Sequence, residues 1–215
     1  MQHKIALILF IATIVLVLCL FIPVGHGPVK YRPINAAFSG INKLALTQGL
    51  VKFNTEHATT SLLRLNELCV IQNIPIILSE GTALGAVRDG KLIPWDDDID
   101  IMIEASHKEK FIAHVIPQMK DFWIAKVWNK GNFITMCKSS LAIDIEFIEI
   151  DVKCSCTIKR CIPCPVEDIL NSLTLVNLRD VPFKAWGPTF LETVYGPTWQ
   201  TPMHRSNKNA RVKGK

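Results

Sequence analysis

The sequence predicts an α/β domain, and three patterns support that fold class. Leucines recur at helical spacing over residues 55–73, which predicts an amphipathic helix. Apolar and acidic residues alternate over residues 98–103 and again over residues 142–151, as in strands with one buried face. Helical and extended patterns follow each other along the chain instead of forming separate blocks, and this order is typical of α/β domains.

The first half of this domain begins with the predicted helix over residues 55–73, which ends before Pro75. A short run rich in isoleucine predicts a strand over residues 74–78. A short helix follows over residues 83–88, because the Asp89-Gly90 pair after it is a turn signal. The alternating strand over residues 98–103 completes this half.

The second half is predicted from the same signals. Apolar periodicity, the turn sequence NKGN, alternation and helix-flanking prolines or glycines mark its elements. They are a helix over residues 107–119 that ends near Pro117, strands over 122–128, 133–138 and 142–151, and helices over 165–171 and 190–195.

The N-terminus reads as a membrane anchor. Residues 5–24 form an uncharged apolar run, and roughly 20 apolar residues are enough to span a bilayer. A secretory signal has a shorter apolar core and a small-residue cleavage site, which is absent here. We therefore favour an uncleaved signal anchor over residues 1–24, although the flanking charges do not decide its orientation.

The remaining chain divides into three parts. Residues 25–54 are expected to be a linker or stem, residues 55–203 the catalytic domain, and residues 204–215 a basic tail. The short N-terminal flank and the cysteines favour a type II, single-pass protein of the Golgi or endoplasmic reticulum, with its domain in the lumen. A net charge of +5 is too modest and too scattered for a nucleic-acid binder, so no nucleic acid is expected as partner.

Four of the seven cysteines are clustered in the stretch CSCTIKRCIPC. In a lumenal domain, Cys154, Cys156, Cys161 and Cys164 could form two disulfides, which we favour. A structural zinc site stays open, although the spacing is not that of a standard zinc finger. The isolated Cys69 and Cys137 lie in apolar segments and are predicted to be small core residues.

The residues that carry chemistry are acidic. Asp98 and Asp100 are two residues apart on a predicted strand, so both carboxylates point to one face. Adjacent carboxylates repel each other, and a divalent cation removes that conflict. Asp144 lies on a second alternating strand and can supply a third ligand. An all-oxygen set of this kind, used with a phosphate substrate, favours Mg²⁺ or Mn²⁺ and phosphoryl transfer.

Residues on the connection before this strand are candidates for substrate binding. Gly81 and Thr82 stand between a strand and a helix, where backbone amides can approach a phosphate closely. Arg88 and Lys91 could neutralise phosphate oxygens, Arg88 in a bidentate manner. Trp95 is a candidate for the nucleotide pocket, with core packing as the alternative.

The stretch GTALGAVRDGKLIPWDDDIDIMI, together with IDIEF and FLETVYGPTW downstream, resembles the LicD and fukutin family, which includes the fukutin-related proteins. This resemblance implies a nucleotidyltransferase fold with a small mixed sheet flanked by helices. It also implies that Asp98, Asp100 and Asp144 are the metal-binding and catalytic residues, and that Gly81 and Thr82 replace the Gly-Ser element of the wider superfamily.

The resemblance further implies a reaction. Family members transfer a phosphorylated alcohol, such as phosphocholine or ribitol phosphate, from a CDP-linked donor to a glycan hydroxyl, and CMP leaves. The expected acceptor is a glycan on protein or lipid. The alternative is a catalytically silent, membrane-tethered relative that binds glycans or stabilises a partner. The intact carboxylate triad favours the enzyme.

Overall fold

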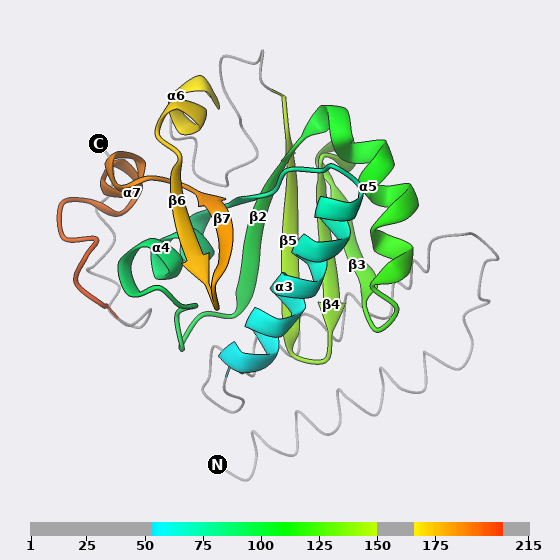
Figure 1. The fold of residues 1–215 in the computed structure, drawn as a ribbon, viewed down its shortest axis with the longest axis horizontal. Helices are drawn as coiled ribbons and strands as arrows, with labels where there is room; N and C mark the ends of the chain where they lie inside the picture. The colour runs from blue at the N-terminus through cyan, green and yellow to red at the C-terminus, as the bar shows by residue number, and fades with distance from the viewer. Residues whose placement is uncertain (1–52, 150–165, 204–215) are drawn as a thin grey trace, which may run out of the picture.

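The computed structural model describes residues 53–149 and 166–203, which build one mixed β-sheet with helices packed against it (Figure 1). The predicted anchor, nearly all of the linker, the cysteine cluster over residues 154–164 and the basic tail lie outside these described residues. Within the described ranges, no helix is both long enough and apolar enough to cross a bilayer.

The structure contains nearly all of the predicted elements and adds two strands. In chain order these are α3 (Thr55–Ile71), β1 (Ile77–Leu78), α4 (Glu80–Asp89), β2 (Asp98–Glu104), the short helix η1 (Ala105–His107), α5 (Lys108–His114), η2 (Ile116–Gln118), β3 (Trp123–Trp128), η3 (Asn129–Gly131), β4 (Phe133–Lys138), β5 (Leu141–Ile148), α6 (Val166–Asn171), β6 (Thr174–Leu178), β7 (Val181–Ala185) and α7 (Pro188–Tyr195).

The sheet has seven strands in the order β3-β4-β5-β2-β1-β7-β6. Its strands are of mixed direction, because β2 runs parallel to β5 and β1 parallel to β7, while the other neighbours are antiparallel. The expectation of a mixed sheet is therefore confirmed, but the expectation of a small one is wrong. The difference comes from the β6–β7 hairpin, which the sequence patterns did not predict.

The missed hairpin has an unusual turn sequence. Arg179 and Asp180 connect the two strands, and both have positive φ angles, of 50° and 64°. Two-residue hairpin turns of this geometry favour Asn and Gly, so an Arg-Asp pair gives no sequence signal. Instead, Arg179 forms an ion pair with Glu56 on α3, which holds the turn against the helix.

Part of the core lies on one face of the sheet. Paired residues on neighbouring strands share a face, so Ile101, Ile145 and Ile134 lie side by side, and each is at most 2% exposed. Figure 1 shows α3 crossing in front of β5 and β4. From α5, Phe111 packs edge-on against Phe147 with the ring centroids 5.8 Å apart. The two isolated cysteines, Cys69 and Cys137, are both buried, as predicted.

Two helix boundaries differ from the prediction. The helix expected over residues 83–88 begins at Glu80, so Gly81 and Thr82 lie inside its first turn and not before it. The helix expected over residues 107–119 is divided into η1, α5 and η2. Pro117 cannot donate the backbone hydrogen bond that a continuous helix requires, which accounts for the end of α5 before η2.

Gly85 in the middle of α4 is required by close packing. A Cβ atom at this position would lie 2.6 Å from the backbone oxygen of Lys91. We expect Gly85→Ala to lower the free energy of unfolding of the full chain by about 1–3 kcal/mol, measured by denaturant titration. Gly90→Ala is the matched control: it has open space but a φ of +64°, so backbone strain alone should cost about 1–2 kcal/mol. An unchanged unfolding midpoint for Gly85→Ala would contradict the packing argument.

Candidate metal centre

The topology brings the start of α4 to the amino-terminal end of β2. Strand β1 is antiparallel to β2, with Leu78 opposite Ile101, so the chain leaves β1 beside the first residues of β2. Helix α4 begins almost at once, at Glu80. The N-terminus of a helix carries a partial positive charge, which favours anions. The acidic residues at the start of β2 therefore lie next to the positive end of α4.

The three predicted carboxylates converge. Asp98 and Asp100 are on β2, and the parallel register with β5 places Asp144 directly opposite Asp100. One carboxylate oxygen from each of the three residues lies within 4.8 Å of the others. The prediction that alternation brings the first two residues to one face is confirmed by this register, and the pairing of β2 with β5 adds the third.

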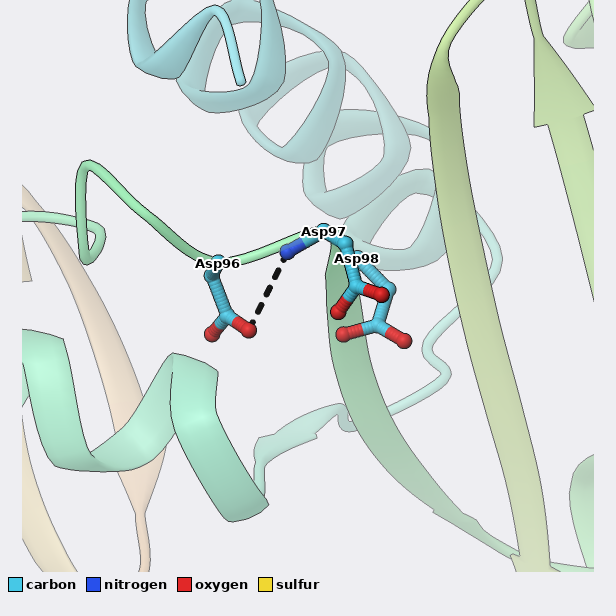
Figure 2. Close-up of side chains that lie close together, drawn as sticks. All are labelled: Asp96, Asp97 and Asp98. Atoms are coloured by element: carbon cyan, nitrogen blue, oxygen red, sulfur yellow. Dashed lines mark hydrogen bonds between the residues drawn. The ribbon is translucent and has the colours of Figure 1, made fainter. Parts of the chain in front are cut away.

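A second acidic group shares Asp98 with the first. One carboxylate oxygen each from Asp96, Asp97 and Asp98 also lies within 4.8 Å of the others. Figure 2 shows these side chains gathered where the chain enters β2, with the backbone N–H of Asp97 donating to Oδ1 of Asp96 at 3.1 Å. Asp97 and Asp98 are only 5% and 8% exposed, so this string of acids is not a solvated surface turn.

Burial and the surrounding negative charge both disfavour ionisation of Asp100. Burial of its carboxyl group, and then the charges of Asp98, Glu80, Asp96 and Asp144, raise the pKa of Asp100 well above its usual range. Each of these causes disfavours the ionised form. A bound cation would reverse the effect, because it would attract the same carboxylates that repel one another.

The donor set fits Mg²⁺ or Mn²⁺. These hard cations take oxygen ligands, and at bond lengths of about 2.0–2.1 Å neighbouring ligand oxygens in an octahedron are about 3 Å apart. Oxygens that already lie within 4.8 Å of each other can reach that spacing by small side-chain rotations. Asp98, Asp100 and Asp144 are therefore the residues that would hold a cation, which would neutralise phosphate charge during transfer.

The backbone of Asp100 forms hydrogen bonds with the residues at the start of α4, which are the N-cap residue Ser79 and Thr82 in the first turn. Its carbonyl oxygen accepts a hydrogen bond from the N–H of Ser79 at 3.1 Å. Its N–H donates to Oγ1 of Thr82 at 2.9 Å. Thr82 is 2% exposed. The predicted contact of this hydroxyl with phosphate stays a prediction.

Gly81 is in direct contact with the acidic group. A Cβ atom on Gly81 would lie 2.3 Å from Oδ2 of Asp96. The φ angle of Gly81 is not in the left-handed region, so glycine matters here for space and not for backbone conformation, and a larger residue would displace the Asp96 carboxylate. The predicted approach of the Gly81 backbone to phosphate stays a prediction.

The other three predicted substrate-binding residues lie elsewhere on the connection. Arg88 is near the far end of α4, about 10 Å along the helix axis from Gly81, and its side chain is 6% exposed. Its guanidinium donates to both carboxylate oxygens of Asp89, at 3.0 and 2.6 Å. Lys91 is exposed beyond the end of the helix. Their roles toward phosphate stay predictions.

Trp95 connects the acidic loop to the end of the domain. Its indole Nε1–H donates to the backbone oxygen of Met203 at 3.2 Å, and its ring packs against the core. This placement agrees with the core-packing alternative for Trp95. A contact with nucleotide remains a prediction.

Two acidic residues near the centre were not predicted as site residues. Glu80 is close enough to Asp100 to raise its pKa, and it has a φ angle of +42° at the first position of α4. A non-glycine residue in this region is strained, and such strain is typical of functional sites. Glu146 follows Asp144 on the same face of β5 and is 7% exposed. The alternation of side chains along a strand places Glu146 on the same face as Asp144 and could have indicated it as a site residue. No local sequence signal indicates Glu80.

The raised pKa of Asp100 predicts how metal binding depends on pH. Because its pKa is higher in the folded protein than in the unfolded chain, its contribution to stability is present below its unfolded pKa, about 3.9, and is lost as pH rises through the folded pKa. A metal would replace the proton. We therefore expect Mg²⁺ or Mn²⁺ to raise the Tm of the full chain more at about pH 8 than at about pH 5. An equal rise at both pH values would contradict this expectation.

Comparisons with known proteins agree with this geometry. The family described as LicD/FKTN/FKRP, nucleotidyltransferase domain, matches residues 73–152, which include β1, α4, β2 and β5. The lipopolysaccharide cholinephosphotransferase LicD of Haemophilus influenzae is 40% identical over 45 residues, which are 21% of this chain and 17% of that protein. The match thus spans less than a fifth of that curated relative.

One solved structure shows a similar fold at low sequence identity. The lincosamide antibiotic adenylyltransferase LnuA, solved with lincomycin bound, superposes with a TM-score of 0.50 at 14% identity, covering 70% of this chain and 92% of that one. The solution structure of the antibiotic-resistance factor ANT(2'')-Ia has a TM-score of 0.46 at 16% identity, covering 61% and 66%. Residues 73–152 match the model of the LicD/FKTN/FKRP family, and this match and the identity to the Haemophilus influenzae protein support the assignment to the LicD family that the central motif predicted.

Proposed function

We propose that this protein is a metal-dependent phosphotransferase that moves a phosphorylated alcohol from a CDP-linked donor to a glycan hydroxyl. The observation that carries the proposal is the convergence of Asp98, Asp100 and Asp144 within 4.8 Å at the start of α4. Family membership supports phosphotransfer in general, and the Haemophilus influenzae relative is a cholinephosphotransferase of lipopolysaccharide.

The proposed reaction breaks the phosphoanhydride bond of the CDP-linked donor and forms a phosphodiester bond to the acceptor. The acceptor oxygen forms a bond to the phosphorus of the alcohol phosphate, and the bond from that phosphorus to the CMP oxygen breaks. CMP leaves with the electron pair, while Asp144 orients the acceptor hydroxyl and takes its proton. Mg²⁺ or Mn²⁺ held by the three aspartates would neutralise the charge on the phosphates. Positioning and charge neutralisation supply most of the acceleration in reactions of this kind.

The cellular setting is part of the proposal. The uncharged apolar run over residues 5–24 would anchor the chain, with the catalytic domain in the lumen of the Golgi or endoplasmic reticulum. Glycans on protein or lipid would be available there as acceptors. The clustered Cys154, Cys156, Cys161 and Cys164 would form disulfides in that compartment, or bind zinc.

Two measurements on the full chain test the function. Calorimetry with Mn²⁺ and CDP should show nucleotide binding that requires the metal. A panel of CDP-alcohols, including CDP-choline and CDP-ribitol, should then give CMP release and an acceptor mass increase equal to one alcohol phosphate. Metal-independent or absent nucleotide binding would favour the silent relative, which binds glycans or a partner without turnover.

A further inference from the structure

At the end of strand β1, the backbone N–H of Asp100 bonds to a side chain and not to the backbone of the neighbouring strand. In a strand, the N–H and C=O groups of one residue point toward the same neighbouring strand. Both groups of Asp100 point toward the chain that leaves β1, where its carbonyl accepts from Ser79 N–H. A regular antiparallel ladder would complete this pair with a bond from Asp100 N–H to the carbonyl of Ser79.

The carbonyl of Ser79 is used elsewhere. It accepts a hydrogen bond from the N–H of Ala83 at 2.9 Å, which is the first backbone hydrogen bond of α4. The N–H of Asp100 donates instead to Oγ1 of Thr82, at 2.9 Å. The hydroxyl of Thr82 therefore completes the strand pairing that the early start of α4 interrupts.

We propose that Thr82 is a positioning residue that holds Asp100 in place through its backbone, and that its hydroxyl is not a primary ligand of phosphate. Thr82 is 2% exposed, so its side chain faces the protein and not a substrate arriving from solvent. Its oxygen accepts the hydrogen bond from Asp100 N–H, which fixes the hydroxyl against the start of β2. The inference rests on the proposed function, because it assigns Thr82 a role in forming the same metal centre.

The consequence concerns the cation directly. Asp100 lies between Asp98 on its own strand and Asp144 across the parallel pair, and it experiences repulsion from both. A backbone held on one side by Ser79 and Thr82 keeps its carboxylate directed at the other two despite that repulsion. Residues that orient metal ligands typically change metal affinity by about 10- to 100-fold when they are replaced.

The test compares three variants of the full chain by titration with Mn²⁺ alone, without nucleotide. Thr82→Val keeps the shape but removes the acceptor, and we expect it to weaken Mn²⁺ binding about 10- to 100-fold. Thr82→Ser keeps the hydroxyl and should bind Mn²⁺ within about threefold of the wild type, because the ligand-orienting bond is retained. Thr59→Val is the matched control, because its hydroxyl bonds only to Thr55 on α3, so Mn²⁺ affinity should be unchanged.

The outcomes separate the possible roles. Wild-type Mn²⁺ affinity in Thr82→Val, combined with weaker CDP binding, would overturn the inference and make Thr82 a phosphate ligand. If Thr82→Val does not fold, Thr82→Cys replaces it, because a thiol is a weaker acceptor and should give intermediate Mn²⁺ affinity. Wild-type affinity in that variant would also overturn the inference. Absence of Mn²⁺ binding by the wild-type chain would overturn the proposed function, and this inference with it.

Discussion

Replacement of Asp100 with Asn is expected to reduce transfer about a thousandfold while the domain stays folded. Asp100 is the central carboxylate, because it lies on the same strand as Asp98 and directly opposite Asp144. Loss of one charged ligand removes part of the charge neutralisation at the transferred phosphate, and about 4 kcal/mol of barrier corresponds to three orders of magnitude in rate. The measurement is CMP release from the preferred CDP-alcohol, followed for the full chain under saturating Mn²⁺.

The same substitution should stabilise the metal-free protein at neutral pH. The carboxyl group of Asp100 is repelled by four neighbouring acids, and Asn removes that repulsion without a large change of volume. We therefore expect an equal or higher Tm without metal, and a smaller rise in Tm on adding Mn²⁺. This pair of results separates loss of a ligand from loss of structure.

Asp121→Asn is the matched control for Asp100→Asn. It makes the same chemical change at a side chain that is 73% exposed and pairs with Lys138 on the surface. Turnover should be unchanged, and because surface ion pairs contribute little, stability should change only slightly. Near-normal turnover in a folded Asp100→Asn variant would refute the metal centre proposed here.

Replacement of Trp186 with Ala is expected to produce the largest loss of stability. Trp186 is fully buried, its Nε1–H points at the sulfur of Met102 at 3.2 Å, and its ring packs edge-on against Phe190 with centroids 4.8 Å apart. Truncation of a buried Trp typically costs about 3–5 kcal/mol, out of a total stability of about 5–15 kcal/mol. Denaturant unfolding of the full chain measures this loss.

Trp186→Phe tests whether the ring or the hydrogen bond matters. A phenyl ring fills much of the same space, so the loss should be clearly smaller than for Ala. Because Met102 is two residues from Asp100 on β2, the folded Phe variant should also retain Mn²⁺ binding. A cost below about 1 kcal/mol for Trp186→Ala would show that the β7 end of the sheet is not part of one core with β2.

Sequence patterns predicted most of the fold where the signal is local. The alternation over residues 98–103 and 142–151 correctly marked β2 and β5, because a strand with one buried face repeats every two residues. The β6–β7 hairpin was missed, because its turn uses Arg179 and Asp180 at positive φ in place of Asn or Gly. The early start of α4 was also missed, because Glu80 adopts a strained backbone conformation that no propensity favours.

The acidic residues of the candidate site were predictable for the same reason. That Asp98 and Asp100 share a face follows from residue parity alone. That Asp144 lies opposite Asp100 depends on β2 pairing in parallel with β5, although β3 and β4 separate them in the chain. The alternation of side chains indicates which face of its own strand Asp144 occupies. It contains no information about which strand lies next to β5 in the sheet.

The sequence by itself therefore determined the α/β class, the acidic pair on one strand and the resemblance to the LicD family, because each depends on a short segment with a strong periodicity or motif. Only the tertiary structure shows that β5 pairs in parallel with β2, which places Asp144 opposite Asp100, and that Glu80 adds charge near Asp100. It also decided that Thr82 bonds to the backbone of Asp100. These features depend on contacts between segments that pack together only in the folded sheet, so no local pattern can specify them.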